Sequence, residues 1–270
     1  MRRNIRTDAK KVGEHYRDDS NLNVRMALHE RFSANERPWH NRVFDHLELA
    51  RGTTELWTRN ADRIPQTRTI TLTDAPPGML QKAEENIKLN LNYTIIRNFR
   101  FILTEAQSLP FRDGGFDVVI ANRMLYHIPD KERVFAEVGR VLGPGGVFYT
   151  STNSEDNMKE MAAFRRILNP KYRVEDETSA FSLENGREQL APWFSEVSLR
   201  KREDALVVTE SGPLVDYLLS MMDAGEASER LSEEEFGGGA SRLAGAVEEE
   251  IDAGGAVRIT KSAGLFEARP

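Results

Sequence analysis

The chain has 270 residues, of which 39% are hydrophobic and 30% are charged, so it can bury a large core and is not a disordered chain. Its 43 acidic residues exceed its 37 basic residues and give a formal charge of -6, which argues against a nucleic-acid partner and against a polybasic membrane contact. The absence of cysteine excludes disulfides, thiolate nucleophiles and zinc–thiolate sites.

The first residues, MRRNIR, are basic but are not followed by the apolar stretch that a secretory signal requires. No apolar run along the sequence approaches the length that spans a bilayer. We therefore expect a cytoplasmic protein with no membrane partner.

Residues 1–40 are polar and have a helical pattern. After a helix cap at Ser20 or Asn21, the apolar residues Leu22, Met26 and Phe32 fall near helical spacing. This segment is predicted to form an N-terminal helical lid.

Residues 41–152 alternate between strand and helix patterns, as a parallel sheet with crossover helices requires. In FDVVIAN the apolar run after Asp117 predicts a central parallel strand that helices cover on both faces. A helix and a Gly-Pro-Gly-Gly turn follow, and we interpret the turn as structural. The fold class is therefore predicted to be α/β, with a Rossmann-like, doubly wound and mostly parallel sheet.

Residues 153–270 contain helical patterns near DNMKEMAAFRRIL and PLVDYLLSMMD, and strand patterns near Val197 and Val257. We expect a substrate-cap insertion in this region, followed by the last strands of the same sheet. The stretch of residues 232–256 is rich in glycine and acidic residues, and it is predicted to be a solvated helix with flexible ends.

Four segments carry a family resemblance: TLTDAPPGMLQKAEENI, TEAQSLPF, FDVVIANRMLYHIPD and LGPGGVFYTST. Their order and spacing resemble class I S-adenosylmethionine-dependent methyltransferases, in particular the small-molecule branch called type 11. The resemblance covers residues 56–152, and more loosely PWFSEVSLRKREDALVVT and AVRITKSAGLFEA resemble the final two strands, the last of them antiparallel. It implies S-adenosyl-L-methionine as the cofactor and a small-molecule acceptor as the substrate.

The glycine-rich loop of that family, E-x-G-x-G-x-G, is altered in this chain. Residues 48–54 keep the acid, Glu48, and the middle glycine, Gly52, but place Ala50 and Thr54 at the other two glycine positions. In a competing alignment residues 41–49 end a helix, and most of the first strand and its loop are missing. Divergence and deletion both remain open.

In open α/β sheets the ligand lies beyond the carboxyl ends of the strands. The resemblance implies that Asp74 binds the ribose hydroxyls, although Asp74 could instead cap the helix that starts near Pro77. It also places Met79 against the adenine, unless this side chain only packs. The predicted cofactor-binding residues are Glu48, Gly52, Asp74, Ala75, Met79, Glu105, Ala106, Gln107, Asn122 and Leu125.

The resemblance gives two of the polar loops a specific role. Glu105 is implied to accept a hydrogen bond from the adenine amino group, and the N–H of Ala106 to donate to a ring nitrogen; a solvent-facing turn acid is the alternative for Glu105. Asn122 is either an acceptor for the amino group of the cofactor or a turn former.

His127 is the candidate catalytic base, because MLYHIPD places an imidazole just past the cofactor loop. A purely local role for His127 and catalysis by proximity alone remain the alternative. Tyr16 and Tyr126 are the candidate substrate-binding residues. The histidines show no metal-ligand spacing, so no metal is expected.

The predicted function is the transfer of a methyl group from S-adenosylmethionine to a hydroxyl or amine of a small molecule, as in secondary metabolism. One alternative is a methyltransferase-fold enzyme with another reaction, such as a cyclisation. The other is a non-catalytic partner subunit. The sequence does not determine the acceptor or the oligomeric state.

Overall fold

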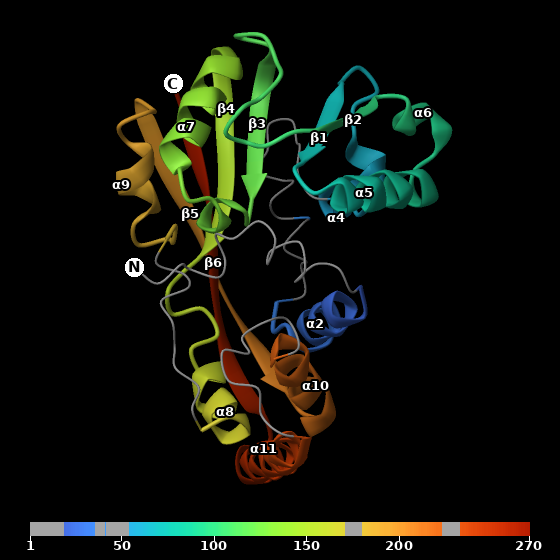
Figure 1. Cartoon of the computed structure of the whole chain (residues 1–270), viewed down its shortest axis with the longest axis vertical. Coiled ribbons are helices and arrows are strands. Elements are labelled where there is room, and N and C mark those ends of the chain that lie inside the picture. Colours follow the sequence, from blue (N-terminus) through green and yellow to red (C-terminus); the bar gives the residue numbers. More distant parts are fainter. Residues whose placement is uncertain (1–18, 36–40, 42–53, 171–179, 223–232) are drawn as a thin grey trace. The chain divides into compact units, whose positions relative to one another are not determined.

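The computed structural model describes residues 19–35, 41, 54–170, 180–222 and 233–270 (Figure 1). The chain forms two compact units, each assembled from several segments. Unit 1 contains the described residues of Met1–Glu36, Ser154–Ser179 and Arg202–Ala263, and unit 2 contains those of Arg37–Asn153, Ala180–Lys201 and Gly264–Pro270. Residues 154–270 thus contribute to both units and do not form one compact unit of their own.

Unit 2 contains most of the parallel sheet and its covering helices. Its elements are α4 (Thr54–Thr58), η2 (Ala61–Arg63), β1 (Ile70–Asp74), α5 (Pro77–Asn90), α6 (Tyr93–Ile96), β2 (Phe99–Leu103), β3 (Phe116–Asn122), η3 (Leu125–His127), α7 (Lys131–Val141), β4 (Leu142–Asn153) and α9 (Gly186–Leu190). Unit 1 contains α2 (Asp19–Phe32), α8 (Met161–Leu168), α10 (Ser211–Met222) and α11 (Glu233–Gly254). The strands β5 (Glu196–Val208) and β6 (Val257–Arg269) supply residues to both units.

The strands of unit 2 are arranged in two sheets. β1 pairs in parallel with β2, with Asp74 opposite Leu103. The second sheet has the order β3-β4-β6-β5, and its first pair is parallel, with Asn122 opposite Ser151. Within the described part of the chain, β3 pairs with β4 alone, so the central position predicted for this strand is not seen there. The region predicted to hold the first strand lies outside the described residues.

The last strand runs antiparallel to its neighbour β4, as expected. Leu142 at the start of β4 and Arg269 at the end of β6 line the same hollow. The Gly-Pro-Gly-Gly segment belongs to the first part of β4, where the register against β3 shifts between Phe116 and Val118. Gly145 has a φ of 74°, a conformation that favours glycine, so the segment predicted as a tight turn is an irregular start of the strand β4.

Helices cover both faces of the sheet, which is the doubly wound arrangement. Successive residues of β4 point to opposite faces, because side chains alternate along a strand. Val147 and Tyr149 pack with α4 and α5 in one hydrophobic cluster, whereas Phe148 packs with α7 in another. In Figure 1, α5 lies along β1 and β2, and α7 lies along β4.

The helix α7 forms where the sequence supplies both a cap and an apolar stripe. The Asp130 carboxylate accepts the N–H of Arg133 at 3.2 Å and satisfies one free donor of the first turn. Val134, Val138 and Val141 recur at helical spacing and are buried against the sheet. The motif IPD-KERVF therefore fixes the start of this helix locally.

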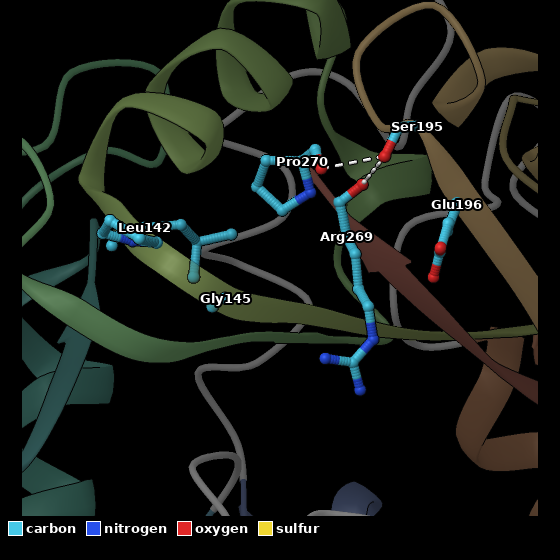
Figure 2. Close-up of a pocket in the computed structure, with 9 residues that line it drawn as sticks. Leu142, Gly145, Ser195, Glu196, Arg269 and Pro270 are labelled. Carbon is cyan, nitrogen blue, oxygen red and sulfur yellow. Dashed lines mark hydrogen bonds between the residues drawn. The ribbon is translucent and has the colours of Figure 1, made fainter.

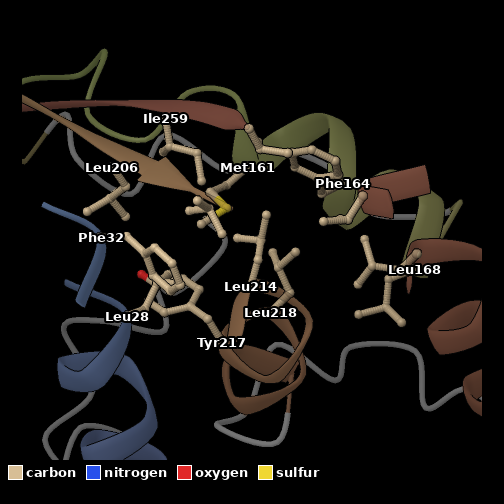
Figure 3. Packing of buried hydrophobic residues seen from close by; sticks show 14 residues of the cluster. Leu28, Phe32, Met161, Phe164, Leu168, Leu206, Leu214, Tyr217, Leu218 and Ile259 are labelled. Atoms are coloured by element: carbon tan, nitrogen blue, oxygen red, sulfur yellow. The ribbon is translucent and has the colours of Figure 1, made fainter. Parts of the chain in front are cut away.

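Unit 1 is built around its own hydrophobic core (Figure 3). Leu28 and Phe32 of α2 pack there with Leu218 of α10. The prediction of a solvated helix for residues 232–256 is only partly right: α11 spans most of the stretch, but Leu243 and Val247 are fully buried in this core. The glycine- and acid-rich composition conceals this short apolar stripe. No helix in the described part of the chain is both long and apolar enough to cross a bilayer.

Candidate functional site

Asp74 is the last residue of β1, at the carboxyl end where a ligand is expected. Burial raises the pKa of its carboxyl group, and a hydrogen bond from the N–H of Ala75 at 2.9 Å opposes this shift in part. Among the described residues no cation pairs with this carboxylate, and a carboxylate desolvated in this way at a strand end is a candidate for ligand binding.

Asp74 does not cap the following helix. α5 begins at Pro77, its N-cap residue is Pro76, and no side chain caps its first turn. The Asp74 Oδ1 atom instead accepts the N–H of the adjacent Ala75. The helix-cap alternative is therefore wrong, and the carboxylate keeps acceptor capacity for another donor. Of its two predicted neighbours, Ala75 is exposed and Met79 is half-buried in the first turn of α5.

The loop after β2 begins next to Asp74. The Thr104 N–H donates to the carbonyl oxygen of Asp74 at 3.0 Å, and the Ser108 N–H donates to the carbonyl oxygen of Glu105 at 3.1 Å. The structure thus brings together the predicted ribose and adenine loops. Glu105 is exposed at the turn, while Ala106 and Gln107 are half-buried.

Two residues of α7, which the sequence pattern did not single out, hold this loop. Arg140 donates to the carbonyl oxygens of Leu109 and Phe111, at 3.0 and 2.7 Å, and Glu137 accepts the N–H of Leu109 at 2.8 Å. The hydrogen bond from Arg140 lowers the pKa of Glu137 to about 2. The only signal in the sequence is a Glu-x-x-Arg spacing that is common on helix surfaces.

The end of β3 presents a second group of polar residues. The Ser151 hydroxyl on β4 donates to the Asn122 Oδ1 atom at 3.0 Å, which orients the amide. Arg123, the next residue, has a φ of 50°, and such strained backbone clusters at ligand sites. Ser151 was missed, because its position opposite Asn122 follows from strand pairing.

The turn after β3 carries the predicted base and a predicted substrate residue. Leu125 is fully buried in the core beside α7, so its side chain anchors the turn. The rings of Tyr126 and His127 are both half-buried, and their centroids lie 4.5 Å apart. Lys131, which sequence reasoning also missed, donates to the carbonyl oxygen of Ile128 at 3.2 Å, and burial lowers the pKa of its ammonium group.

Three of the predicted site residues, Tyr16, Glu48 and Gly52, lie outside the described residues, as does most of the glycine-rich loop. The remaining ones fall into two groups, around Asp74 and around Asn122. Both groups stand on strands that share one hydrophobic cluster, which contains Ile70 and Leu72 of β1 and Val118 of β3. In the described residues there is no cluster of His, Asp or Glu side chains suited to a metal ion.

A hollow of about 480 Å³ lies at the opposite end of β4 and is not part of this group (Figure 2). Gly145 and Arg269 line it, and the Ser195 hydroxyl donates to the carbonyl oxygen of Pro270 at its edge, at 2.8 Å. Because it adjoins the amino end of β4, it lies at the wrong edge of the sheet for the cofactor.

The polar loops lie in a part of the chain that matches a known protein family. Residues 47–150 match the family model described as a methyltransferase domain. This range contains β1 to β3, the loops after them and most of β4. Residues 47–150 are therefore a methyltransferase domain.

Two curated relatives share this methyltransferase domain. Malonyl-[acyl-carrier protein] O-methyltransferase of Geobacter sulfurreducens is 32% identical over 123 residues, which are 45% of this chain and 43% of that protein. The ubiquinone/menaquinone biosynthesis C-methyltransferase UbiE of Klebsiella pneumoniae is 32% identical over 100 residues, which are 37% of this chain and 39% of that protein. The chain thus matches less than half the length of either relative.

A solved structure has a similar fold. The [4+2]-cyclase SpnF superposes with a TM-score of 0.56 and 16% sequence identity, covering 98% of this chain and 96% of that one. At this identity the likeness shows the fold alone. The Rossmann-like α/β architecture predicted for the methyltransferase domain is confirmed.

Proposed function

We propose that the chain binds S-adenosylmethionine with its methyltransferase domain and transfers the methyl group to a hydroxyl or amine of a small molecule. The observation that carries this proposal is the half-buried carboxylate of Asp74, which does not cap α5. The backbone carbonyl oxygen of the same residue accepts the N–H of Thr104, at the start of the loop that carries Glu105. This combination suits a nucleoside, because ribose hydroxyls need an acceptor and adenine needs a donor and an acceptor.

The residues of the site fit the nucleoside half of the cofactor. Asp74 accepts hydrogen bonds from the two ribose hydroxyls, and Glu105 accepts one from the adenine amino group. Asn122, whose Oδ1 atom accepts the Ser151 hydroxyl, would accept a hydrogen bond from the amino group of the methionine half. When bound, S-adenosylmethionine supplies a methyl group on a positively charged sulfur, so the chain need only align the acceptor and remove its proton.

His127 is the proposed base for that proton. A neutral imidazole accepts a proton near physiological pH, and the Leu125–His127 turn follows directly from the end of β3. The half-buried phenol of Tyr126 beside it is the proposed contact for the acceptor.

A second candidate function is favoured by Ala50 and Thr54, which stand in place of glycines. It is a protein with the same fold that has lost or altered its use of the cofactor, either a cyclase-type enzyme or a partner subunit.

Calorimetric titration of S-adenosylhomocysteine into the purified chain tests the proposal. We expect saturable binding with one site per chain, followed by methyl transfer from S-adenosylmethionine when acceptor alcohols and amines are screened. Binding without transfer to any acceptor would favour the cyclase-type enzyme. No binding at millimolar ligand would contradict the proposal and favour the partner subunit.

A further inference from the structure

The last two turns of α7 hold the loop of residues 104–115, which connects β2 to β3. A guanidinium group has five N–H donors, and in Arg140 every one of them has an acceptor. Three reach the loop and two reach Glu137: the acceptors are the carbonyl oxygens of Leu109 (3.0 Å) and Phe111 (2.7 Å), Asp113 Oδ1 (2.7 Å), Glu137 Oε1 (2.7 Å) and Glu137 Oε2 (2.8 Å).

Glu137 also contacts the loop, from the same face of α7 as Arg140. Its Oε2 atom accepts the N–H of Leu109 at 2.8 Å, so both polar groups of the Leu109 backbone are held by α7. The carbonyl oxygen of Arg140 also accepts the N–H of Gly114, at 2.9 Å. Hydrogen bonding to Arg140 lowers the pKa of Glu137 to about 2. The carboxylate therefore stays ionised at neutral pH and well into the acidic range, and its hydrogen bonds to Leu109 and Arg140 are kept.

The other end of the loop is held by β1. The Thr104 N–H donates to the carbonyl oxygen of Asp74 at 3.0 Å, and the Thr104 hydroxyl donates to the carbonyl oxygen of Ser108 at 2.9 Å. The turn of residues 104–108 therefore lies between two anchors, β1 on one side and α7 on the other. Leu109, the residue that α7 holds, comes directly after this turn.

The side chain of Glu105 is exposed at this turn, so packing does not fix its position. Its position depends instead on the conformation of the loop backbone. N–H···O hydrogen bonds span donor–acceptor distances of only about 2.7–3.2 Å and require good alignment, so a contact to adenine tolerates little displacement of Glu105. A loop released at Leu109 would spread over more conformations than such a contact tolerates.

We propose that Glu137 and Arg140 are positioning residues for the cofactor, which fix the place of Glu105 through the backbone of Leu109. This inference rests on the proposed function, because it assigns the adenine contact to Glu105. Neither residue touches the cofactor in this scheme, and their effect on binding passes through the loop.

A double-mutant cycle tests the proposal, with the dissociation constant of S-adenosylhomocysteine as the readout. The variants are Glu105→Ala, Glu137→Ala and the double variant, each first checked for a folded circular-dichroism spectrum. We expect each single variant to bind about tenfold more weakly, the effect of losing one hydrogen bond to a charged group. The dissociation constant of the double variant should exceed that of Glu105→Ala by less than about twofold, because the effects of coupled residues are not additive.

Glu84→Ala is the matched control, since it removes a glutamate that pairs with Lys88 within α5 and holds no loop. Its affinity should stay within about twofold of wild type. Glu137→Gln is the second variant if Glu137→Ala fails to fold; it keeps an acceptor for Leu109 and should show the same coupling to Glu105 with a smaller loss. If Glu137→Ala weakened binding by the same factor in the wild-type chain and in the Glu105→Ala variant, the positioning role would be overturned. If the wild-type chain does not bind the ligand at all, the proposed function fails, and this inference fails with it.

Discussion

At the residue scale, the proposed function assigns the ribose hydroxyls of the cofactor to Asp74. Asp74→Asn keeps the size of the side chain but removes the charge that two ribose hydroxyls would share. We expect S-adenosylhomocysteine to bind about 2–3 kcal/mol more weakly, the cost of weakening hydrogen bonds to a charged acceptor. Calorimetry on both proteins gives this difference directly. Equal affinities would place the ribose elsewhere.

The same substitution should affect stability in the opposite direction. Burial raises the pKa of Asp74 above its ordinary value of 3.8, so the folded chain holds the proton more tightly than the unfolded chain. The resulting stabilisation is complete below about pH 3.8 and is lost as the pH rises through the raised pKa. The melting temperature of Asp74→Asn, measured relative to wild type, should therefore increase from acidic to neutral pH. A difference that stays constant with pH would mean that the carboxylate is not desolvated.

His127 is expected to affect the chemical step and not the cofactor. His127→Ala should lower methyl transfer to a hydroxyl or amine by about 10²–10⁴-fold, which is the usual contribution of a positioned base. Cofactor affinity should stay near the wild-type value, because the proposed function assigns the imidazole to the acceptor and not to the cofactor. The pH dependence of turnover should also lose one limb near the pKa of histidine. A rate within a few-fold of wild type would reduce His127 to a structural residue of its turn.

At the scale of single elements, two of the glycines in α11 have opposite environments. A Cβ atom on Gly239 would lie 2.5 Å from the backbone oxygen of Leu168, at the end of α8, whereas one on Gly245 would meet nothing within 4 Å. Gly239→Ala should destabilise the protein by about 1–3 kcal/mol, because α8 or α11 must move. Gly245→Ala should stabilise it by about 0.5–1 kcal/mol, because alanine loses less conformational entropy in a helix.

Urea unfolding of these two variants separates close packing from helix propensity. They carry the same substitution in the same helix, so each serves as the control for the other. Equal changes in the free energy of unfolding would show that α11 does not pack closely on α8.

At the scale of the whole molecule, each of the two units has hydrophobic clusters of its own. Leu218 is fully buried in the core of unit 1, so Leu218→Ala should cost about 2–5 kcal/mol of unfolding free energy. Hydrogen exchange should speed up mainly in the described segments of unit 1, and much less in β3 and α7 of unit 2. Leu89→Ala is the control, since this leucine is 81% exposed and its loss should change stability by less than about 0.5 kcal/mol. Uniform loss of protection would show that both units unfold together.

The sequence alone determined the local features of the fold. The apolar run of β3, the Asp130 cap and apolar stripe of α7, and the polar residues at the strand ends all follow from residues close together in the chain. The order of these segments was also enough to predict the α/β class and the methyltransferase family, because that order fixes which strand ends share one edge of the sheet.

The tertiary structure decided the contacts between distant segments. It showed that Asp74 does not cap α5, that Ser151 orients Asn122, and that Glu137 and Arg140 hold the loop of Glu105. It also buried Leu243 and Val247 in a helix whose composition predicts solvation. These contacts depend on strand register and helix packing, which bring together residues that no local pattern links. The sequence therefore predicts which strand ends carry the polar residues of the candidate site, and the three-dimensional fold determines which side chains contact them.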